Sequence, residues 1–342
     1  MEYRQLGRTG VKVSSLCLGC MMFGGKTNAE DSYAIIDAAL DAGINFVDTA
    51  NVYSRGKSEE VTGEALKRNG KRARVVLATK VHGTMDESDP NSQGTSRRHI
   101  IAECEASLRR LQTDYIDLYQ LHRPRPEIAI DETLRALDDL VRSGKVRYIG
   151  TSTFAAWQVV EYLWVAKELG LNRFVSEQPP YNLLDRRVER ELIPMCRTFG
   201  IGVIPWSPLG GGLLTGKYRR GESAPDGSRF ANVPTDSPMA RRMLAQRMRD
   251  QVFDVVGGID PIAREKGCTV SQLALAWVVQ QPGVTSPIIG PRTMDQLQDN
   301  LKALDVQLVD ADLLRVDEIV PPGSNVSAFY EASFGPHEHR LS

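Results

Sequence analysis

Residues 44–60, INFVDTANVYSRGKSEE, begin as a short apolar run and end in polar and charged side chains. The run INFV has the composition of a buried β-strand, yet the acid Asp48 follows it directly, and the phenol of Tyr53 follows five residues later. A carboxylate at the end of an apolar strand costs free energy unless another group pairs with it or uses it. The ends of the other predicted strands therefore decide which fold contains Asp48.

Further β-rich segments alternate with amphipathic helical segments along the chain. After a hairpin over residues 3–14, strands are predicted at 14–19, 44–48, 75–80, 115–122, 146–152, 174–178, 201–206 and 286–290. Helices are predicted between them, for example over 29–42, closed by Gly43, and over 96–111, with Ser96 as the N-cap. Strands that alternate with helices in this number predict an α/β fold, the closed (β/α)8 TIM barrel, rather than an open sheet.

The rest of the chain is assigned to the same fold, since no linker, repeat or low-complexity tract interrupts residues 1–342. We therefore expect a single barrel domain. The irregular parts are long loops at the carboxyl-terminal face of the barrel, predicted at 20–28, 82–95 and 207–248, and a tail over 321–342.

Composition limits the kinds of partner. With 42 Lys+Arg against 43 Asp+Glu the net charge is −1, so no global charge favours nucleic acid or an anionic membrane. The longest apolar run, LALAWVV, is too short to span a bilayer, and the start MEYRQLGRTG has no apolar segment of the kind that directs secretion. Five cysteines, an odd number without such a signal, indicate reduced thiols and a cytoplasmic protein. The oligomeric state stays open.

The cysteine pair CLGC, Cys17 to Cys20, has the spacing of a redox motif. A reactive pair places its first cysteine at a helix N-terminus, whereas this pair lies in and just after an apolar strand. No second pair completes a zinc site. Ordinary packing is therefore the favoured interpretation, and no metal is expected.

Polar side chains gather at the predicted strand ends, which in a barrel of this kind form the active site. Each of them alone is compatible with a structural role, but together they indicate a functional cluster. In chain order the ends carry Asp48, Lys80, His122, Ser152, Gln178, Trp206 and Gly290, the last followed by Arg292.

These residue types suit proton donation to an oxygen that is becoming an alkoxide, as in carbonyl reduction. Tyrosine is a weak acid, a neighbouring ammonium stabilises tyrosinate, and a carboxylate holds that ammonium in place. A neutral His122 would orient the substrate oxygen. An isomerase or aldolase that uses Lys80 as a Schiff-base nucleophile is an alternative, but it leaves Tyr53, Trp206 and residues 286–300 unexplained.

The chain resembles the aldo-keto reductases in FVDTANVY, LATKV, LRRLQTDYIDLYQLHRP, IGTSTF, WSPLGGGLLTGKY and PIIGPRTMDQLQDN, which follow one another as in that family. The resemblance implies the family's barrel and its catalytic tetrad, here Asp48, Tyr53, Lys80 and His122. Tyr53 would give a proton to a small-molecule aldehyde or ketone while NADPH gives hydride. Which carbonyl compound is the substrate stays open.

The resemblance also implies how NADPH/NADP+ is held. Trp206 would stack on the nicotinamide, Ser152 and Gln178 would hold its carboxamide, residues 207–218 would wrap the pyrophosphate, and Arg292 would contact the 2′-phosphate. The implied cofactor-binding residues are Asp48, Ser152, Gln178, Trp206, Ser207, Leu209, Gly211, Lys217, Arg229, Gly290, Arg292, Gln296, Asp299 and Asn300.

The chain departs from the common family pattern in two places. It has Thr153 where many members have an asparagine amide, a feature shared with the branch that contains bacterial reductases and potassium-channel β subunits. Cys20 and Met21 are expected in the pocket wall, where relatives often have threonine and an aromatic residue.

This branch supplies an alternative function, a nucleotide-binding regulatory partner with little turnover, like the channel β subunits. Those proteins commonly lack the histidine of the tetrad, so the presence of His122 favours an enzyme.

The tail contains three aromatic residues, Phe329, Tyr330 and Phe334, in a spacing that fits neither a helix nor a strand. Aromatic residues are rare in disordered tails because they bury apolar surface when they can. In relatives the C-terminal loop borders the substrate mouth of the barrel. We therefore expect 324–336 to pack beside that mouth.

Overall fold

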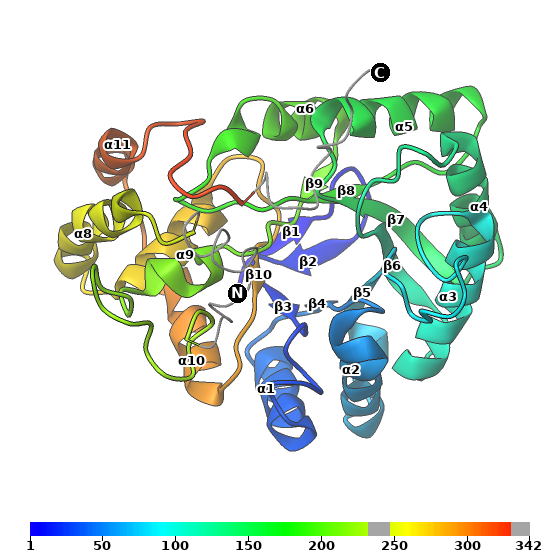
Figure 1. The fold of residues 1–342 in the computed structure, drawn as a ribbon, viewed down its shortest axis with the longest axis horizontal. Coiled ribbons are helices and arrows are strands. Elements are labelled where there is room, and N and C mark those ends of the chain that lie inside the picture. The colour runs from blue at the N-terminus through cyan, green and yellow to red at the C-terminus, as the bar shows by residue number, and fades with distance from the viewer. Residues whose placement is uncertain (232–246, 330–342) are drawn as a thin grey trace.

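Parallel strands form the centre of the molecule in the computed structural model, which describes residues 1–231 and 247–329 (Figure 1). Eight strands lie in the order β10-β3-β4-β5-β6-β7-β8-β9, and each pairs in parallel with its neighbour. They are β3 (Cys17–Gly19), β4 (Phe46–Asp48), β5 (Val76–Val81), β6 (Ile116–Leu121), β7 (Val146–Ser152), β8 (Ser176–Gln178), β9 (Gly202–Val203) and β10 (Ile288–Ile289).

Main-chain contacts close this sheet where β9 meets the segment that leads into β10. The carbonyl of Val203 accepts from Thr285 N at 2.8 Å, the carbonyl of Pro205 accepts from Ile288 N at 2.8 Å, and a parallel bridge joins Val203 to Val284. The predicted (β/α)8 barrel is confirmed.

Helices surround the barrel (Figure 1). They are α1 (Ala29–Asp41), α2 (Lys57–Arg68), α3 (Arg97–Leu111), α4 (Ile130–Arg142), α5 (Ala156–Glu168), α6 (Leu192–Phe199), α8 (Asp250–Glu265), α9 (Val270–Gln280), α10 (Met294–Lys302) and α11 (Asp310–Ile319). The predicted N-cap of α3 is confirmed, since the Ser96 side chain accepts from His99 N. None of the helices in the described part of the chain is long and apolar enough to cross a bilayer.

The alternation of side chains along each strand separates the barrel interior from the helix-facing side. On β6, Leu118 packs inside the barrel, whereas Tyr119 and Leu121 belong to the larger core shared with the helices. The hairpin of β1 (Tyr3–Gln5) and β2 (Lys12–Ser14) contributes to the interior. The interior apolar cluster comprises Leu6, Val13, Cys17, Phe46, Ala78, Leu118, Val175 and Ile204.

Six of the predicted strands are shorter in the structure than expected, and two of these differences have a local cause. Residues 14–16 were assigned to the first barrel strand, but Ser14 pairs with Tyr3 in the hairpin, so β3 begins only at Cys17. The strand predicted at 201–206 is reduced to Gly202–Val203. Pro205 has no N–H to donate to a ladder, so the regular strand ends before it, and Trp206 pairs only through an isolated parallel bridge to Pro180.

A glycine in α2 provides a test of how tightly the helical layer packs. A Cβ atom at Gly63 would lie 2.5 Å from the backbone carbonyl of Leu111 at the end of α3. Alanine normally stabilises a helix interior relative to glycine by about 1 kcal/mol. Because of the clash, Gly63→Ala should instead lower the free energy of unfolding by about 1–3 kcal/mol, as measured by denaturant titration.

The matched control is Gly257→Ala in α8, where a Cβ would meet no atom within 4 Å. That variant should be more stable than wild type by about 0.5–1 kcal/mol. A Gly63→Ala protein stabilised to the same extent would contradict the packing of α2 on α3.

Candidate active site

Asp48 and Lys80 form a buried ion pair inside the barrel, directly above the apolar layer. The Lys80 ammonium lies 2.5 Å from Asp48 Oδ1 and also donates to the carbonyl of Thr49 at 2.8 Å. Strand alternation explains the position, because Phe46 and Ala78 of the apolar cluster precede these residues by two places on β4 and β5. Burial alone would lower the pKa of Lys80, but Asp48 and Tyr53 outweigh it and raise that pKa. The lysine is therefore an ammonium at neutral pH.

Tyr53 begins the short helix η1 (Tyr53–Gly56), and its hydroxyl lies 3.4 Å from Lys80 Nζ. The next two residues, Ser54 and Arg55, have φ values of 50° and 53°, a left-handed conformation that turns the chain sharply after the tyrosine. The Tyr53 ring meets the His122 ring edge to face, with centroids 5.6 Å apart. The loop thus places the phenol between a cation and an imidazole.

His122 is neutral in this environment. Burial, together with the positive charges of Arg123 and Lys80, holds the pKa of His122 well below its ordinary value of 6.5. A neutral imidazole both donates and accepts hydrogen bonds. The structure thus brings all four predicted tetrad residues together, with Lys80 fully buried and the other three lining a cavity.

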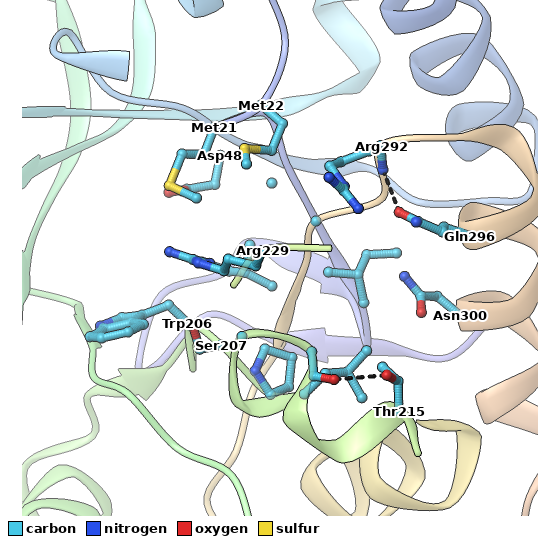
Figure 2. Close-up of a pocket in the computed structure, with 18 of the residues that line it drawn as sticks. Met21, Met22, Asp48, Trp206, Ser207, Thr215, Arg229, Arg292, Gln296 and Asn300 are labelled. Atoms are coloured by element: carbon cyan, nitrogen blue, oxygen red, sulfur yellow. Dashed lines mark hydrogen bonds between the residues drawn. The ribbon is translucent and has the colours of Figure 1, made fainter. Parts of the chain in front are cut away.

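That cavity has a volume of about 650 Å3 and extends from the tetrad to α10 (Figure 2). All of the residues predicted to bind the cofactor line it. Trp206 and Met21 lie toward one end, and Arg292, Gln296 and Asn300 lie toward the other. The size is suitable for a large organic ligand, since ligand pockets typically span about 300–1,000 Å3.

Lys217, Arg229 and Arg292 are among the cations that line the cavity without a carboxylate partner in the described part of the chain. Arg292 Nη1 donates to the carbonyl of Gly227 at 2.9 Å. Burial and the charge of Arg292 lower the pKa of Lys217, and burial lowers that of Arg229. Several cations gathered at one end of a cavity without a carboxylate to neutralise them favour the binding of an anion such as phosphate.

A glycine-rich turn lies beside these cations. The short helix η4 (Gly210–Thr215) contains Gly211 and Gly212 with φ values of 66° and 97°, which residues with side chains rarely adopt. A Cβ at Gly212 would lie 3.3 Å from Lys217 Nζ. The glycines therefore leave open the part of the cavity nearest the lysine.

Thr153 occupies an unusual backbone conformation at the end of β7. Its φ of 60° lies in the left-handed region, which asparagine tolerates better than a β-branched residue does. Its hydroxyl is within hydrogen-bond distance of Trp206 Nε1 at 3.3 Å and of Arg123 Nη1 at 3.2 Å. Thr153 therefore positions the indole of Trp206 and the guanidinium of Arg123. It does not offer an amide to the cavity, as asparagine would.

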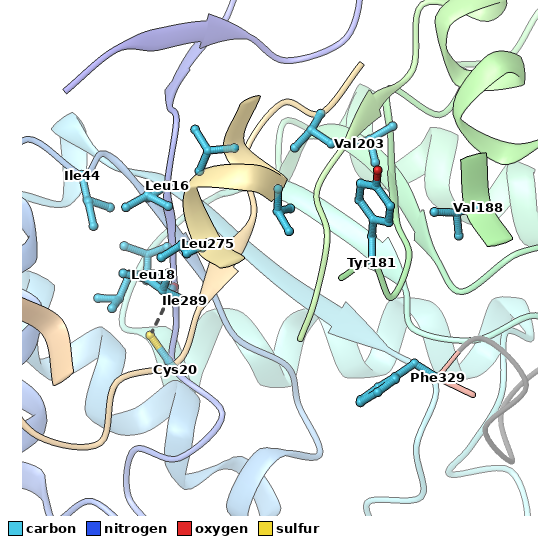
Figure 3. Close-up of a cluster of buried hydrophobic side chains, with 14 of the residues drawn as sticks. Leu16, Leu18, Cys20, Ile44, Tyr181, Val188, Val203, Leu275, Ile289 and Phe329 are labelled. Carbon is cyan, nitrogen blue, oxygen red and sulfur yellow. Dashed lines mark hydrogen bonds between the residues drawn. The ribbon is translucent and has the colours of Figure 1, made fainter. Parts of the chain in front are cut away.

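The expectation that Cys20 lines the pocket is wrong. Gly19 and Met21 line the cavity, whereas the Cys20 side chain points to the opposite side and is fully buried. Figure 3 shows it beside Leu18 and Ile289 in the core outside the barrel. Met21 does reach the cavity, as expected, and Met22 lies beside it (Figure 2).

The described part of the C-terminal tail packs against the end of the cavity that contains Trp206. Phe329 is buried, its ring centroid lies 6.4 Å from that of Trp206, and its N–H donates to Asp185 Oδ2 at 2.7 Å. The N–H groups of Val326 and Ser327 both donate to the carbonyl of Leu184. Residues 324–329 thus lie beside the cavity, and the rest of the predicted range 324–336 lies outside the described residues.

Sequence reasoning did not select several residues of the site, of which Gln120, Arg123 and Glu177 bear most directly on it. Gln120 stands two places before His122 on β6, so counting by two along the strand would have found it. Arg123 donates to the carbonyl of His122 at 2.5 Å and lines the cavity. Glu177 is fully buried outside the barrel interior, and its Oε1 accepts from Phe154 N at 3.1 Å.

A family model described as "Aldo/keto reductase family" matches residues 15–321. The chain is 42% identical to a Bacillus subtilis (strain 168) protein named "Uncharacterized oxidoreductase YrpG", over 94% of this chain and 97% of the relative. It is 40% identical to a "Probable voltage-gated potassium channel subunit beta" of Oryza sativa subsp. japonica (90% and 92%). It is 36% identical to a "Versiconal hemiacetal acetate reductase" of Aspergillus parasiticus (94% and 98%).

The pH dependence of stability should report on Glu177. Burial raises the pKa of this carboxyl from 4.5 to about 7, so the folded protein favours the protonated form. Stability is then lost as pH rises from 4.5 through 7, and the loss corresponds to about 3 kcal/mol. Glu177→Gln, which imitates the protonated acid, should exceed wild type by about this amount in denaturant titrations above pH 7 and match it below pH 4.5.

The control is Glu161→Gln, at an exposed position of α5. Its stability should not differ from that of wild type in the way expected for Glu177→Gln. An equal stability of Glu177→Gln and wild type at alkaline pH would mean that Glu177 is ionised in the folded protein at no cost.

Proposed function

The chain belongs to the aldo/keto reductase family of oxidoreductases, and we propose that it reduces aldehydes and ketones to alcohols with NADPH, with Tyr53 as the proton donor. The observation that carries the proposal is the position of Lys80 Nζ, 2.5 Å from Asp48 Oδ1 and 3.4 Å from the Tyr53 hydroxyl, the two residues through which it meets the cavity that they line.

In the proposed reaction a hydride and a proton are added across the carbonyl double bond. NADPH, when bound, supplies the hydride to the carbonyl carbon. The Tyr53 O–H bond breaks as its proton passes to the carbonyl oxygen, and the Lys80 ammonium stabilises the tyrosinate that remains. Asp48 keeps Lys80 charged and in position, so the cation is in place before charge develops.

His122 is assigned a different task in this scheme. As a neutral imidazole beside Tyr53 it can donate a hydrogen bond to the carbonyl oxygen without competing as an acid. The oxygen would then be held by two neighbouring donors, the phenol and the imidazole. Such positioning orients the carbonyl relative to the hydride donor.

The residues of the cavity fit NADPH as the cofactor. Trp206 offers an aromatic face, and Ser152 and Gln178 offer polar groups near the tetrad. At the other end, Lys217, Arg229 and Arg292 provide the positive charge that phosphate groups require. Gln296, Asp299 and Asn300 on α10 line the cavity next to them and would contact the adenosine.

A second candidate function follows from the relatives named as channel subunits: nucleotide binding with little turnover. The neutral, pocket-facing His122 favours the enzyme, because the regulatory relatives commonly lack this histidine. The two functions share the same cavity, so binding of NADPH alone does not separate them.

Two measurements test the proposal. Quenching of protein fluorescence on mixing with NADPH reports binding, and the loss of NADPH absorbance reports turnover over a panel of aromatic aldehydes, dicarbonyls, aldoses and keto-sugars. Binding with turnover supports the reductase, and binding without turnover on any class supports the regulator. Absence of NADPH binding would remove both.

Cofactor preference should depend on Arg292. Its guanidinium is suited to the 2′-phosphate that distinguishes NADPH from NADH, and a hydrogen bond to a charged group contributes about 1.5–3 kcal/mol. Arg292→Ala should therefore weaken NADPH binding by about ten- to a hundred-fold and leave NADH binding nearly unchanged, as measured by titration. Arg135→Ala, an exposed arginine on α4, is the control. An unchanged NADPH/NADH preference in Arg292→Ala would show that another residue reads the phosphate.

Turnover and cofactor binding should separate at Tyr53 and His122. Tyr53→Phe removes only the proposed proton donor, so carbonyl reduction should be abolished while the Kd for NADPH stays close to that of wild type. His122→Asn should bind NADPH and turn over much more slowly. Tyr33→Phe, which alters a tyrosine of α1, should behave as wild type. Reduction of aldehydes by Tyr53→Phe at the wild-type rate would refute the proposed role of Tyr53.

A further inference from the structure

Gln120 is a fully buried amide between two residues of the proposed site. Its Nε2 donates to Asp48 Oδ2 at 3.1 Å, and its Oε1 accepts from Gln178 Nε2 at 3.3 Å. Gln178 Nε2 also donates to Asp48 Oδ2, at 2.9 Å. Neither end of the Gln120 amide is left unsatisfied, which offsets the cost of burying it.

The chemistry of the carboxylate fixes the orientation of both amides. An ionised carboxylate only accepts hydrogen bonds, so the amide nitrogens of Gln120 and Gln178 must face Asp48. The Gln120 oxygen then faces Gln178, whose amide nitrogen donates both to that oxygen and to Asp48 Oδ2. The carbonyl oxygen of Gln178 is therefore the end of that amide that remains for the cavity which Gln178 lines.

The neighbouring strand leaves space for this arrangement. Gly150 on β7 is paired with Gln120. A Cβ at that position would lie 3.3 Å from Gln120 Cγ and 2.4 Å from Ser176 Oγ. A side chain at this position would clash with Ser176 and crowd the Gln120 side chain. A glycine inside a strand normally weakens it, so this one marks a close approach.

We propose that Gln120 is a positioning residue that couples the amide of Gln178, which would meet the nicotinamide carboxamide, to the carboxylate that holds Lys80. The inference rests on the proposed function, because it takes NADPH as the ligand of the cavity. Gln120 touches neither cofactor nor substrate in this assignment. Together with Asp48 it holds the amide nitrogen of Gln178 away from the cavity, and it donates to the Asp48 oxygen opposite the one bound by Lys80.

A double-mutant cycle on NADPH binding tests the coupling without relying on activity. Gln120→Met keeps the length of the side chain and removes both hydrogen bonds. It should raise the Kd for NADPH by about five-fold in the wild-type background, the effect of one neutral hydrogen bond. In a Gln178→Ala background the same substitution should have no effect on Kd, since Gln120 acts through Gln178. An equal effect in both backgrounds would overturn the proposal.

Turnover provides a second readout with a matched control on the same strand. Gln120→Met should lower kcat about ten-fold, with little change in the KM of the carbonyl substrate, because Asp48 loses a donor. Tyr119→Phe alters the adjacent residue, which points away from the barrel interior and whose hydroxyl donates to the carbonyl of Ile100 at 3.5 Å. It should match wild type in both measurements. A Gln120→Met protein with wild-type kcat and Kd would overturn the proposal.

If Gln120→Met does not fold, Gln120→Asn gives the same decision. It keeps the amide but shortens the side chain by one methylene, so the amide no longer reaches both Asp48 and Gln178. The Kd for NADPH should then rise and kcat should fall as expected for Gln120→Met, and wild-type values of both would overturn the proposal. Failure of the wild-type protein to bind NADPH would instead refute the proposed function.

Discussion

The buried ion pair of Lys80 and Asp48 is the interaction on which the rest of the site depends. Removing either partner would leave an uncompensated charge in the barrel, at a cost of several kcal/mol. The chain satisfies the pair completely: the ammonium meets Asp48, Thr49 and Tyr53, and the second carboxylate oxygen meets two glutamine amides. This polar layer lies directly above an apolar one. On β4 and β5 the barrel interior therefore changes from apolar to polar within two residues of the strand.

Loops around the barrel position the other groups of the site relative to this ion pair. The chain turns sharply at Ser54 and Arg55, directly after the tyrosine whose hydroxyl meets Lys80. Trp206 is held from one side by Thr153 and packed from the other by Phe329, whose N–H is bonded to Asp185. The walls of the cavity therefore come from segments far apart in the sequence, which a rigid barrel brings to one end.

The sequence was sufficient for the barrel and for the set of residues that gather at its carboxyl-terminal end, because strand periodicity and strand ends are local features. It was not sufficient for details set by packing across strands. The extent of β3 depends on the pairing of Ser14 with Tyr3, and the direction of Cys20 depends on where that strand starts. Gln120 reads as an ordinary strand residue until Gly150 on the neighbouring strand is seen to make room for it. The conformation of Thr153 also contradicts its local preference, so only tertiary contacts reveal it.

Lys80 and His122 lie in one environment but have different protonation states. Both lie at the same end of the barrel, Lys80 fully buried and His122 half-buried, and burial acts on both in the same direction, against the charged form. Lys80 remains charged because Asp48 compensates for the burial, whereas His122 has only cations nearby, Arg123 and Lys80 itself, and remains neutral. Asp48, the carboxylate of this layer in the described part of the chain, thus gives the two residues different roles. Lys80 is a fixed cation next to the phenol oxygen, and His122 is an uncharged hydrogen-bond donor next to the phenol ring. A second carboxylate near His122 would favour the imidazolium and remove that distinction, so the polar groups next to Asp48 are amides rather than acids.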